Sequence, residues 1–297
     1  MDRDQLLQER QIGLGGTDCA AICGVSSFKS PLDVYYEKIN GPAEYDNSTL
    51  KRGRRAERYI LEEYAEHTGE TLITDLPMLQ DAKHPFLIGH VDARVQNQNI
   101  IIEAKSTRFN ASTWKGTLPQ IYLYQIAHYA SISNADRVDI AVLFNNWEYG
   151  CFSYYRNEEL EKQIKQTAID FWHNHIIPKV PPLPTNMKDI IKTYPNSVEC
   201  KEVVGNETII KKVNDLALIS KQMKILGQKE EDIKLEIMNY MQDAEKLNAA
   251  GLSVTWKHYT QNRLDTSKLK EERPEIYAQY LKTNDLRPLK LIERSGI

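Results

Sequence analysis

The sequence lacks the long apolar segments of membrane and secreted proteins. No hydrophobic run approaches the roughly 20 residues that a membrane-spanning helix needs, and the opening segment MDRDQLLQER is charged where a signal peptide is apolar. We therefore expect no membrane partner and a cytoplasmic location. No internal repeat or low-complexity tract is present either, which argues against a repeat architecture.

Cysteine is scarce, and its spacing fits no metal motif. The four cysteines, Cys19, Cys23, Cys151 and Cys200, form no C-x-x-C and have no histidine partners at zinc spacing. They also lack the arrangement that an iron–sulfur cluster requires. The sequence therefore predicts reduced, packed thiols.

A strong excess of basic residues is absent as well. The formal net charge is −3, with 41% hydrophobic and 27% charged residues, which are ordinary values for a soluble globular protein. No overall basic field therefore indicates a nucleic-acid partner. A local basic patch can still coexist with an acidic total, and residues 50–58, LKRGRRAER, hold four Arg and one Lys. The solvated start of a helix would explain these charges equally well.

The hydrophobic pattern divides the chain into three zones. Residues 1–182 alternate helical and strand-like patterns, and the Pro-punctuated stretch that follows indicates a linker over residues 183–206. Residues 207–297 form an extension of helix plus a short strand at 252–259. Apolar residues at steps of three and four over 207–247 predict one long amphipathic helix or a helical hairpin broken near Gly227.

The first zone predicts an α/β protein built on a mixed sheet. Helices are expected at 15–25, with Thr17 or Asp18 as N-cap, at 52–69 and at 118–133. Strand pairs are expected within 89–107 and 136–156, each pair around a polar turn. Helices alternating with strand pairs fit a central sheet flanked by helices.

The stretch GHVDARVQNQNIIIEAKST, residues 89–107, places charges at the end of an apolar strand. Asp92 and Glu103 can converge because paired residues across a hairpin are close. Together with the Ala104 carbonyl they form an oxygen-only site suited to Mg²⁺ or Mn²⁺. Lys105 shares the face of Glu103 and can orient or deprotonate a water.

The competing interpretation of E-x-K is a salt bridge between Glu103 and Lys105 on a solvent-exposed edge strand of the sheet. The run from Ile100 to Ile102 favours a central, buried strand instead.

The order of these residues resembles that of the PD-(D/E)xK nucleases. It runs G-x-x-x-E (Gly53 to Glu57), Asp92, E-x-K (Glu103, Lys105), then Y-x-x-Q-x-x-x-Y from Tyr122 through Gln125 to Tyr129. Within that superfamily it is similar to the phage lambda exonuclease and YqaJ-type viral recombinase family, whose opening motif resembles RQIGLGGTDCAAICGV. SFKSPLDVYYEK and FWHNHIIPKVPP resemble further segments of the family. The resemblance covers roughly residues 7 to 182 and implies a restriction-endonuclease-like core, here with a mainly helical C-terminal extension.

The family's site residues carry over by position. The resemblance implies that the metal ligands are Asp92, Glu103, the Ala104 carbonyl and Glu57. It implies that Lys105 activates or positions the water, and that Gln125 holds Lys105 or the water, with Tyr122 supporting the same face. It further implies that Arg10 and Thr17 bind the 5′-phosphate of a DNA end beside the amides of a helix N-terminus. Thr17 departs from the serine usual in the family's motif, since it adds a methyl group.

Each assignment has a simpler alternative. Thr17 would serve as an N-cap and Arg10 as a surface ion-pair partner. Glu57 would be a solvated helix residue, Gln125 a core amide, and Tyr122 a packing residue.

The resemblance implies a Mg²⁺-dependent 5′→3′ exonuclease that acts on double-stranded DNA ends and leaves 3′ single-stranded tails for recombination by annealing. Mn²⁺ would substitute for Mg²⁺. Expected partners are double-stranded DNA ends, a single-strand annealing protein and further copies of the chain in a ring, with three as the expected number. Two alternatives stay open: an endonuclease or repair-type nuclease of the same fold, and a DNA-end-binding module without turnover.

Overall fold

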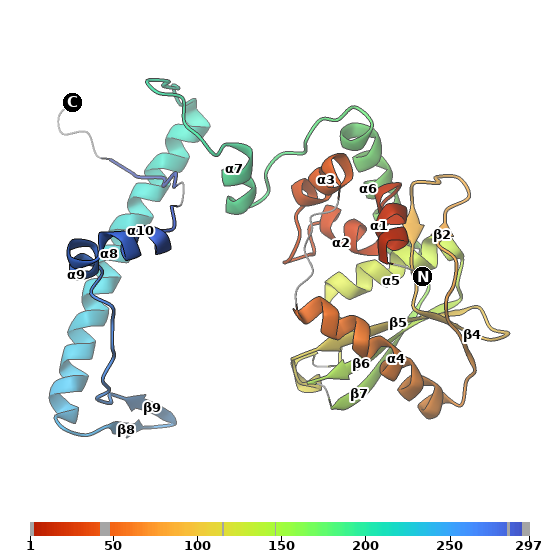
Figure 1. Ribbon diagram of the computed structural model, residues 1–297, viewed down its shortest axis with the longest axis horizontal. Coiled ribbons are helices and arrows are strands. Elements are labelled where there is room, and N and C mark those ends of the chain that lie inside the picture. Colours follow the sequence, from red (N-terminus) through yellow and green to blue (C-terminus); the bar gives the residue numbers. More distant parts are fainter. Residues whose placement is uncertain (1–2, 42–47, 115, 146, 284–285, 293–297) are drawn as a thin grey trace. The chain divides into compact units, whose positions relative to one another are not determined.

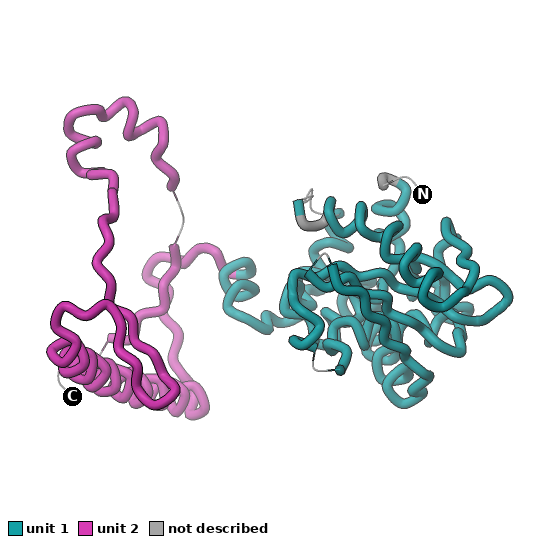
Figure 2. Tube along the Cα trace, turned by 90° about the horizontal axis from the view of Figure 1, so that it is seen from below, with its two compact units in different colours: residues 1–193 teal, residues 194–297 magenta. Residues whose placement is uncertain are grey.

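The computed structural model describes residues 3–41, 48–114, 116–145, 147–283 and 286–292. The chain divides into two compact units, Met1–Thr193 and Tyr194–Ile297 (Figure 2). Among the described residues, no helix combines the length and apolar character needed to cross a bilayer.

A five-stranded mixed sheet forms the centre of the first unit (Figure 1). Its order is β1 (Leu72–Ile73), β4 (Ala93–Val95), β5 (Ile100–Thr107), β6 (Arg137–Phe144) and β7 (Glu148–Tyr155). β5 and β6 are parallel and the other neighbours are antiparallel. The isoleucine run lies in the middle strand, which confirms the predicted mixed sheet with a buried central strand. A short hairpin of β2 (Leu79–Gln80) and β3 (Ile88–Gly89) lies outside this sheet.

Helices cover both faces of the sheet, as the predicted class requires. The helices of the first unit are α1 (Arg3–Gln11), α2 (Gly16–Ile22), α3 (Pro31–Asn40), α4 (Ser48–Thr68), α5 (Gln120–Ser133), α6 (Glu158–Phe171) and α7 (Met187–Thr193), with a 3-10 turn at Ala111–Trp114 and a π-helical turn at Trp172–Ile176. Ile60 and Tyr64 of α4 pack on Ile102 at one face. Side chains of α2, α5 and α6 pack on Ile101 at the other face.

The period of two along β5 therefore sends alternate residues to different layers. Ile102 faces α4, whereas Ile101 faces the layer of α2 and α5, and Glu103 and Lys105 continue the row of Ile101. The end of β5 is thus within reach of helices from both layers, which is where the predicted site lies.

The segment predicted as a linker begins with residues docked on the first unit. α7 supplies Asp189, which is buried and accepts a hydrogen bond from Ser30 Oγ at 2.8 Å. Lys192 of the same helix pairs with Asp33 of α3 at 2.9 Å. These contacts place the boundary between the units after Thr193.

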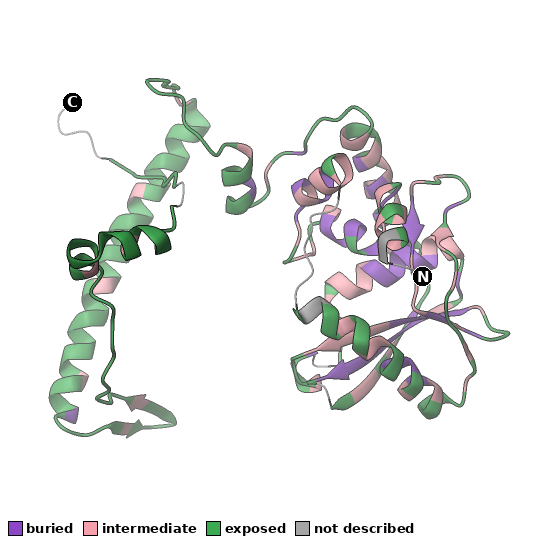
Figure 3. Cartoon of the chain, in the orientation of Figure 1, coloured by how far each residue is buried: buried purple, intermediate pink, exposed green. Residues whose placement is uncertain are grey.

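The second unit contains one long helix and little buried surface. α8 (Glu207–Met241) continues through Gly227, so the predicted long helix is present and the alternative of a helical hairpin is wrong. A hairpin of β8 (Lys246–Ala249) and β9 (Leu252–Thr255) follows, then α9 (Thr266–Glu272) and α10 (Pro274–Tyr280). Figure 3 shows that buried residues concentrate in the first unit, whereas the second is exposed almost throughout.

Candidate active site

The hairpin of β4 and β5 brings two carboxylates together. Ala93 pairs with Ile102 in the antiparallel register, so Asp92, one residue earlier, lies opposite Glu103. Asp92 Oδ2 accepts a hydrogen bond from the Ala104 backbone N–H at 2.7 Å. The predicted convergence of Asp92, Glu103 and Ala104 is therefore what the fold produces.

Glu103 is the most buried member of the group, with only 4% of its surface exposed. Its Oε1 accepts from Gln125 Nε2 at 2.7 Å and forms an ion pair with the Lys105 ammonium. Within the described chain, no hydrogen-bond donor reaches the buried Oε2. A buried carboxylate oxygen without a donor is costly unless a cation or another donor satisfies it. This oxygen therefore fits a metal ligand.

Glu57 comes to the site from α4. Burial raises the pKa of Glu57, and the charge of Glu103 raises it further, while Lys105 opposes the shift. Burial also raises the pKa of Asp92 well above its usual range, helped by the charges of Glu103 and Glu57. The three carboxylates therefore repel one another electrostatically, and a divalent cation would relieve this repulsion.

The described residues hold no group of three or more His, Cys, Asp and Glu side chains arranged as a metal site. A cation here would rest chiefly on Asp92, Glu103 and the Ala104 carbonyl, with Glu57 as an outer member. A cavity of about 560 Å³ is lined by Asp92 and Glu57 together with Arg54 and Arg58 of α4. The basic patch of the sequence thus contributes to the wall of the site.

Lys105 is protonated in this arrangement. Burial disfavours its ammonium form, but the charges of Glu103 and Asp92 outweigh that effect and raise its pKa. Its Nζ lies 5.6 Å from the centre of the Tyr122 ring, a cation–π contact. Tyr122 therefore borders the same face as Lys105.

Gln125 connects the carboxylates to the helical layer. Its Nε2 also donates to the Tyr129 hydroxyl at 2.9 Å. Both side chains are buried, and α2 packs closely on them, because a Cβ on Gly16 would lie 2.8 Å from Gln125 Cγ. The Arg10 charge is near enough to lower the pKa of Tyr129, a pKa that burial and Glu103 raise well above its usual range.

Thr17 is exposed at the start of α2 and does not cap it. The N-cap is Gly15, whose N–H donates to Asp18 Oδ2 at 3.2 Å, so the sequence-based choice of Thr17 or Asp18 as N-cap is wrong. Because the N-cap glycine has no side chain, the hydrogen bond at this helix start is made by the side chain of Asp18, the third residue of α2, which accepts from the Gly15 N–H. The Thr17 hydroxyl is therefore not used as a cap.

Asp18 also organises the segment between Arg10 and Thr17, a role that the sequence pattern did not indicate. Its carboxylate is buried and pairs with Lys29 and Lys38, both at 2.7 Å. Burial disfavours the charged carboxylate, but the two ammonium groups hold the pKa of Asp18 well below its usual range. Lys38 additionally donates to the Arg10 carbonyl at 2.6 Å.

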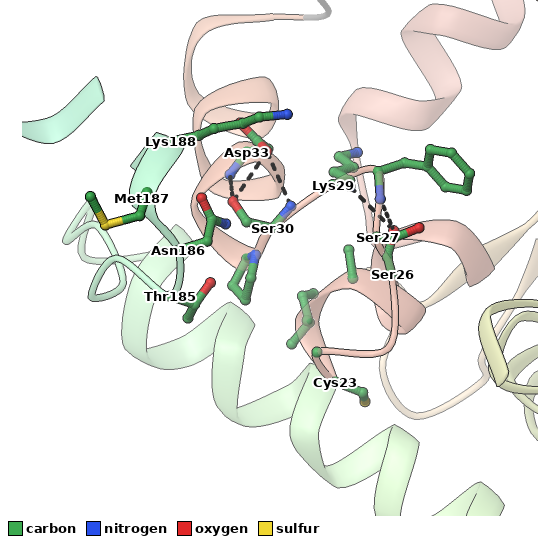
Figure 4. Close-up of a pocket in the computed structure, with 15 residues that line it drawn as sticks. Cys23, Ser26, Ser27, Lys29, Ser30, Asp33, Thr185, Asn186, Met187 and Lys188 are labelled. Atoms are coloured by element: carbon green, nitrogen blue, oxygen red, sulfur yellow. Dashed lines mark hydrogen bonds between the residues drawn. The ribbon is translucent and has the colours of Figure 1, made fainter. Parts of the chain in front are cut away.

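A second cavity of about 660 Å³ lies beside this network, between the α2–α3 loop and residues 185–188 (Figure 4). Ser30 and Asp33 hydrogen-bond at its wall. None of the predicted site residues lines it.

The mixed sheet with its flanking helices, and the position of Asp92, Glu103 and Lys105 at the end of β5, are those of the PD-(D/E)xK nuclease fold. Residues 5–136 match the YqaJ-like viral recombinase domain. The chain is 24% identical over 297 residues to the uncharacterized protein YqaJ of Bacillus subtilis (strain 168), with 97% of this chain and 93% of that protein covered.

Solved structures support the same fold. The alkaline exonuclease LHK-Exo from Laribacter hongkongensis matches with a TM-score of 0.50 and 15% identity, covering 60% of this chain and 94% of that one. Its complex with dAMP matches with a TM-score of 0.50 and 14% identity, covering 64% of this chain and 97% of that one.

Proposed function

We propose that the protein is a divalent-cation-dependent 5′→3′ exonuclease that degrades one strand from double-stranded DNA ends and leaves 3′ single-stranded tails. The observation that carries this proposal is Glu103, buried between Asp92, Lys105 and Gln125 with one carboxylate oxygen lacking a donor. An alkaline exonuclease among the proteins of similar fold, with a structure in complex with dAMP, supports exonuclease over endonuclease.

Four residues at and near the end of β5 would bind the metal ion. Asp92, Glu103 and the Ala104 carbonyl would hold Mg²⁺, with Glu57 contributing from α4, and Mn²⁺ would fit the same oxygen donors. When bound, the cation polarises the phosphodiester and lowers the pKa of water.

Lys105 carries a positive charge at the same face, where it orients the attacking water and offsets the negative charge that develops on the phosphate. Gln125 fixes Glu103 through the 2.7 Å hydrogen bond and is itself fixed by Tyr129. Tyr122 packs beside the Lys105 ammonium and restricts its movement. The chain thus supplies positioning and electrostatic stabilisation.

We assign the preference for 5′-phosphorylated DNA ends to Arg10 and Thr17. Both side chains are exposed. Thr17 follows Gly16, which packs against Gln125 and Tyr129, and the charge of Arg10 acts on Tyr129. An Arg and a hydroxyl group suit a terminal phosphate. Arg54 and Arg58 line the cavity next to the carboxylates and would contact the DNA backbone. From the family resemblance, we include a ring of three copies and a single-strand annealing protein as partners.

End-labelled DNA tests this function directly. Purified protein with Mg²⁺ is incubated with linear duplex carrying 5′-phosphate or 5′-hydroxyl ends, and with a closed circle. We expect mononucleotides from the 5′-phosphorylated ends, no cutting of the circle, and loss of activity in Lys105→Ala. Lys162→Ala, a change at an exposed lysine of α6, is the matched control and should be fully active.

Two results would replace the proposal. Cutting of the closed circle would identify an endonuclease. Binding to DNA ends without turnover in either Mg²⁺ or Mn²⁺ would identify a DNA-end-binding module.

A further inference from the structure

α8 presents apolar side chains along a helix that the described residues of its own unit leave exposed. Among its 35 residues, only Met241 at the very end is buried (Figure 3). Large apolar side chains repeated along an exposed helix mark a binding surface rather than ordinary surface composition.

These side chains follow a heptad repeat. With Ile209 assigned to position a, the a residues are Ile209, Leu216, Met223, Glu230 and Ile237, and the d residues are Lys212, Ile219, Leu226, Ile233 and Tyr240. Eight of these ten positions are apolar. The four consecutive a and d positions from Leu216 to Leu226 are all apolar, and only Lys212 and Glu230 interrupt the pattern on either side. Such an apolar a/d repeat is the pattern of a coiled coil. Seven of the eight apolar side chains are exposed, from 39% for Leu216 to 77% for Tyr240, and Ile237 is partly covered.

The a and d positions together form the contact face of the helix, here called the seam. Its two charged residues, Lys212 and Glu230, determine which partner helix fits and whether it runs parallel or antiparallel. In a parallel, in-register pair of identical helices, Lys212 would face Lys212 and Glu230 would face Glu230, which is unfavourable on both counts. An antiparallel pair centred at residue 221 places Lys212 of one copy opposite Glu230 of the other. In the same register Leu216 meets Leu226, so the charged pair lies next to apolar layers.

The remaining layers of that register are apolar as well. Ile209 lies opposite Ile233, and Ile219 lies opposite Met223. Sliding the pair by one heptad in either direction would place Lys212 against Ile237 or against Met223 and leave Glu230 without its partner. One register therefore satisfies the apolar and the charged positions together.

We propose that α8 is one strand of an antiparallel two-stranded coiled coil formed with a second copy of this chain. The contact is isologous, so it closes as a two-fold pair. The paired segment from residue 209 to residue 233 is about 37 Å long at 1.5 Å per residue. Glu230 currently pairs with Lys234 of its own helix at 2.8 Å, but both side chains are exposed, and such surface pairs exchange at little cost.

Charge reversal tests the pairing in the full-length protein. Lys212→Glu places glutamate opposite Glu230, and Glu230→Lys places lysine opposite Lys212, at two sites in each pair. We expect each single variant to self-associate roughly tenfold more weakly and its mass by light scattering to fall to half the wild-type value. The double variant Lys212→Glu/Glu230→Lys, and an equimolar mixture of the two single variants, should recover the wild-type mass.

Loss of a two-fold contact halves the mass of the assembly for any number of copies that the first unit brings together. The mass measurement therefore tests the α8 pairing separately from the nuclease proposal. Nuclease activity should persist in all these variants, because their substitutions lie outside the first unit. Single variants with unchanged mass, or a double variant no better than the singles, would overturn the pairing. Lys211→Glu, on the same turn but outside the seam, is the matched control and should leave the mass unchanged.

Cross-linking tests the direction. The exposed Cys151 and Cys200 are first replaced by serine. A protein with Leu216→Cys mixed with one carrying Leu226→Cys should form an interchain disulfide, because these positions face each other. Leu216→Cys alone should not, since in the antiparallel register its two copies lie about 15 Å apart along the helix. A disulfide formed by Leu216→Cys alone would indicate a parallel pair, and no cross-link in the mixture would contradict any pairing in this register.

Discussion

Gln125 holds Glu103 from the adjacent helical layer, with its Nε2 donating to Glu103 Oε1 at 2.7 Å. The same nitrogen donates to the Tyr129 hydroxyl at 2.9 Å, and both residues belong to α5. The position of a strand-end carboxylate is thus fixed by a helix that packs on the sheet. Removing the amide would leave Glu103 with Lys105 alone and would release it to move.

Gln125→Leu should therefore reduce the rate of DNA hydrolysis without unfolding the protein. Groups that orient a ligand residue typically contribute 10- to 100-fold to activity, and we expect a loss of about that size in kcat. Gln120→Leu, on an exposed position of the same helix, is the matched control and should retain wild-type activity. Equal activity of the two variants on linear duplex DNA would contradict the positioning role.

Asp92→Asn should abolish activity and at the same time stabilise the cation-free protein. The pKa of Asp92 is raised in the folded state, so folding disfavours its charged form. This cost is absent below the unfolded pKa of about 4 and grows as the pH rises above it toward the raised folded pKa. The amide oxygen of the variant can still accept the hydrogen bond from Ala104.

We expect the variant to have a higher unfolding free energy than the wild type at pH 7.5 and to match it near pH 3.5. Thermal melting over this pH range measures the difference. Added Mg²⁺ should raise the Tm of the wild type and have little effect on the variant. Asp136→Asn, an exposed change, is the control, and a variant less stable than the wild type at pH 7.5 would contradict the electrostatic cost.

The strand-end site is predictable from sequence because its determinants are local. Asp92, Glu103 and Lys105 lie within one hairpin, where the period of two fixes which side chains share a face. The Ile100–Ile102 run correctly indicates a central strand. Gln125 and Tyr129 follow from helical periodicity, because residues four apart share a face.

The contacts missed from sequence join distant segments. Asp18 of α2 meets Lys29 and Lys38 only after α3 and the loop before it have packed against α2, and no periodicity encodes that meeting. The docking of α7 rests on Ser30 and Asp189, which are separated by 159 residues. A Pro-rich stretch therefore predicted a linker where the fold places a docked helix, because local composition does not reveal a buried partner.

Thr17 should determine the preference for phosphorylated ends. Thr17→Val keeps the shape of the side chain and removes the hydroxyl, and a hydrogen bond to a charged group contributes enough for a loss of about tenfold in kcat/KM. We expect that loss on 5′-phosphorylated duplex and no change on 5′-hydroxyl duplex. Thr17→Ser restores the hydroxyl and should behave like the wild type. Equal losses on both substrates would remove Thr17 from the phosphate site.

His128 should make stability depend on pH. It is fully buried in α5, with its ring nitrogens against Ile88 O at 2.8 Å and Cys19 Sγ at 3.3 Å, and burial lowers the pKa of His128 to about 4 from 6.5. The neutral form is thus favoured by folding. Its contribution is complete above pH 6.5 and is lost as the pH falls toward 4.

The loss between these limits amounts to roughly 3 kcal/mol of unfolding free energy. Urea denaturation of the wild type between pH 7 and pH 4 should show this decline. His128→Gln keeps an amide donor for Ile88 O and should show a shallower decline. His258→Gln, an exposed change in the second unit, should retain the full slope, and parallel slopes in His128→Gln and the wild type would refute this origin.

Gly16 keeps the α2–α5 contact close enough for Gln125 to reach Glu103. A Cβ at this position would lie 2.8 Å from Gln125 Cγ and 2.9 Å from the Gln125 carbonyl oxygen, too close for either atom to remain in place. Gly16→Ala should therefore push α2 from α5 and cost about 1 to 3 kcal/mol of stability, as overpacking does. Gly53→Ala in α4 meets nothing within 4 Å and should instead stabilise the protein by about 0.5 to 1 kcal/mol, because alanine favours the helix. Denaturation gives both values, and the nuclease assay should show a loss for Gly16→Ala alone. Equal activity of the two variants would mean that the α2–α5 spacing does not control the site.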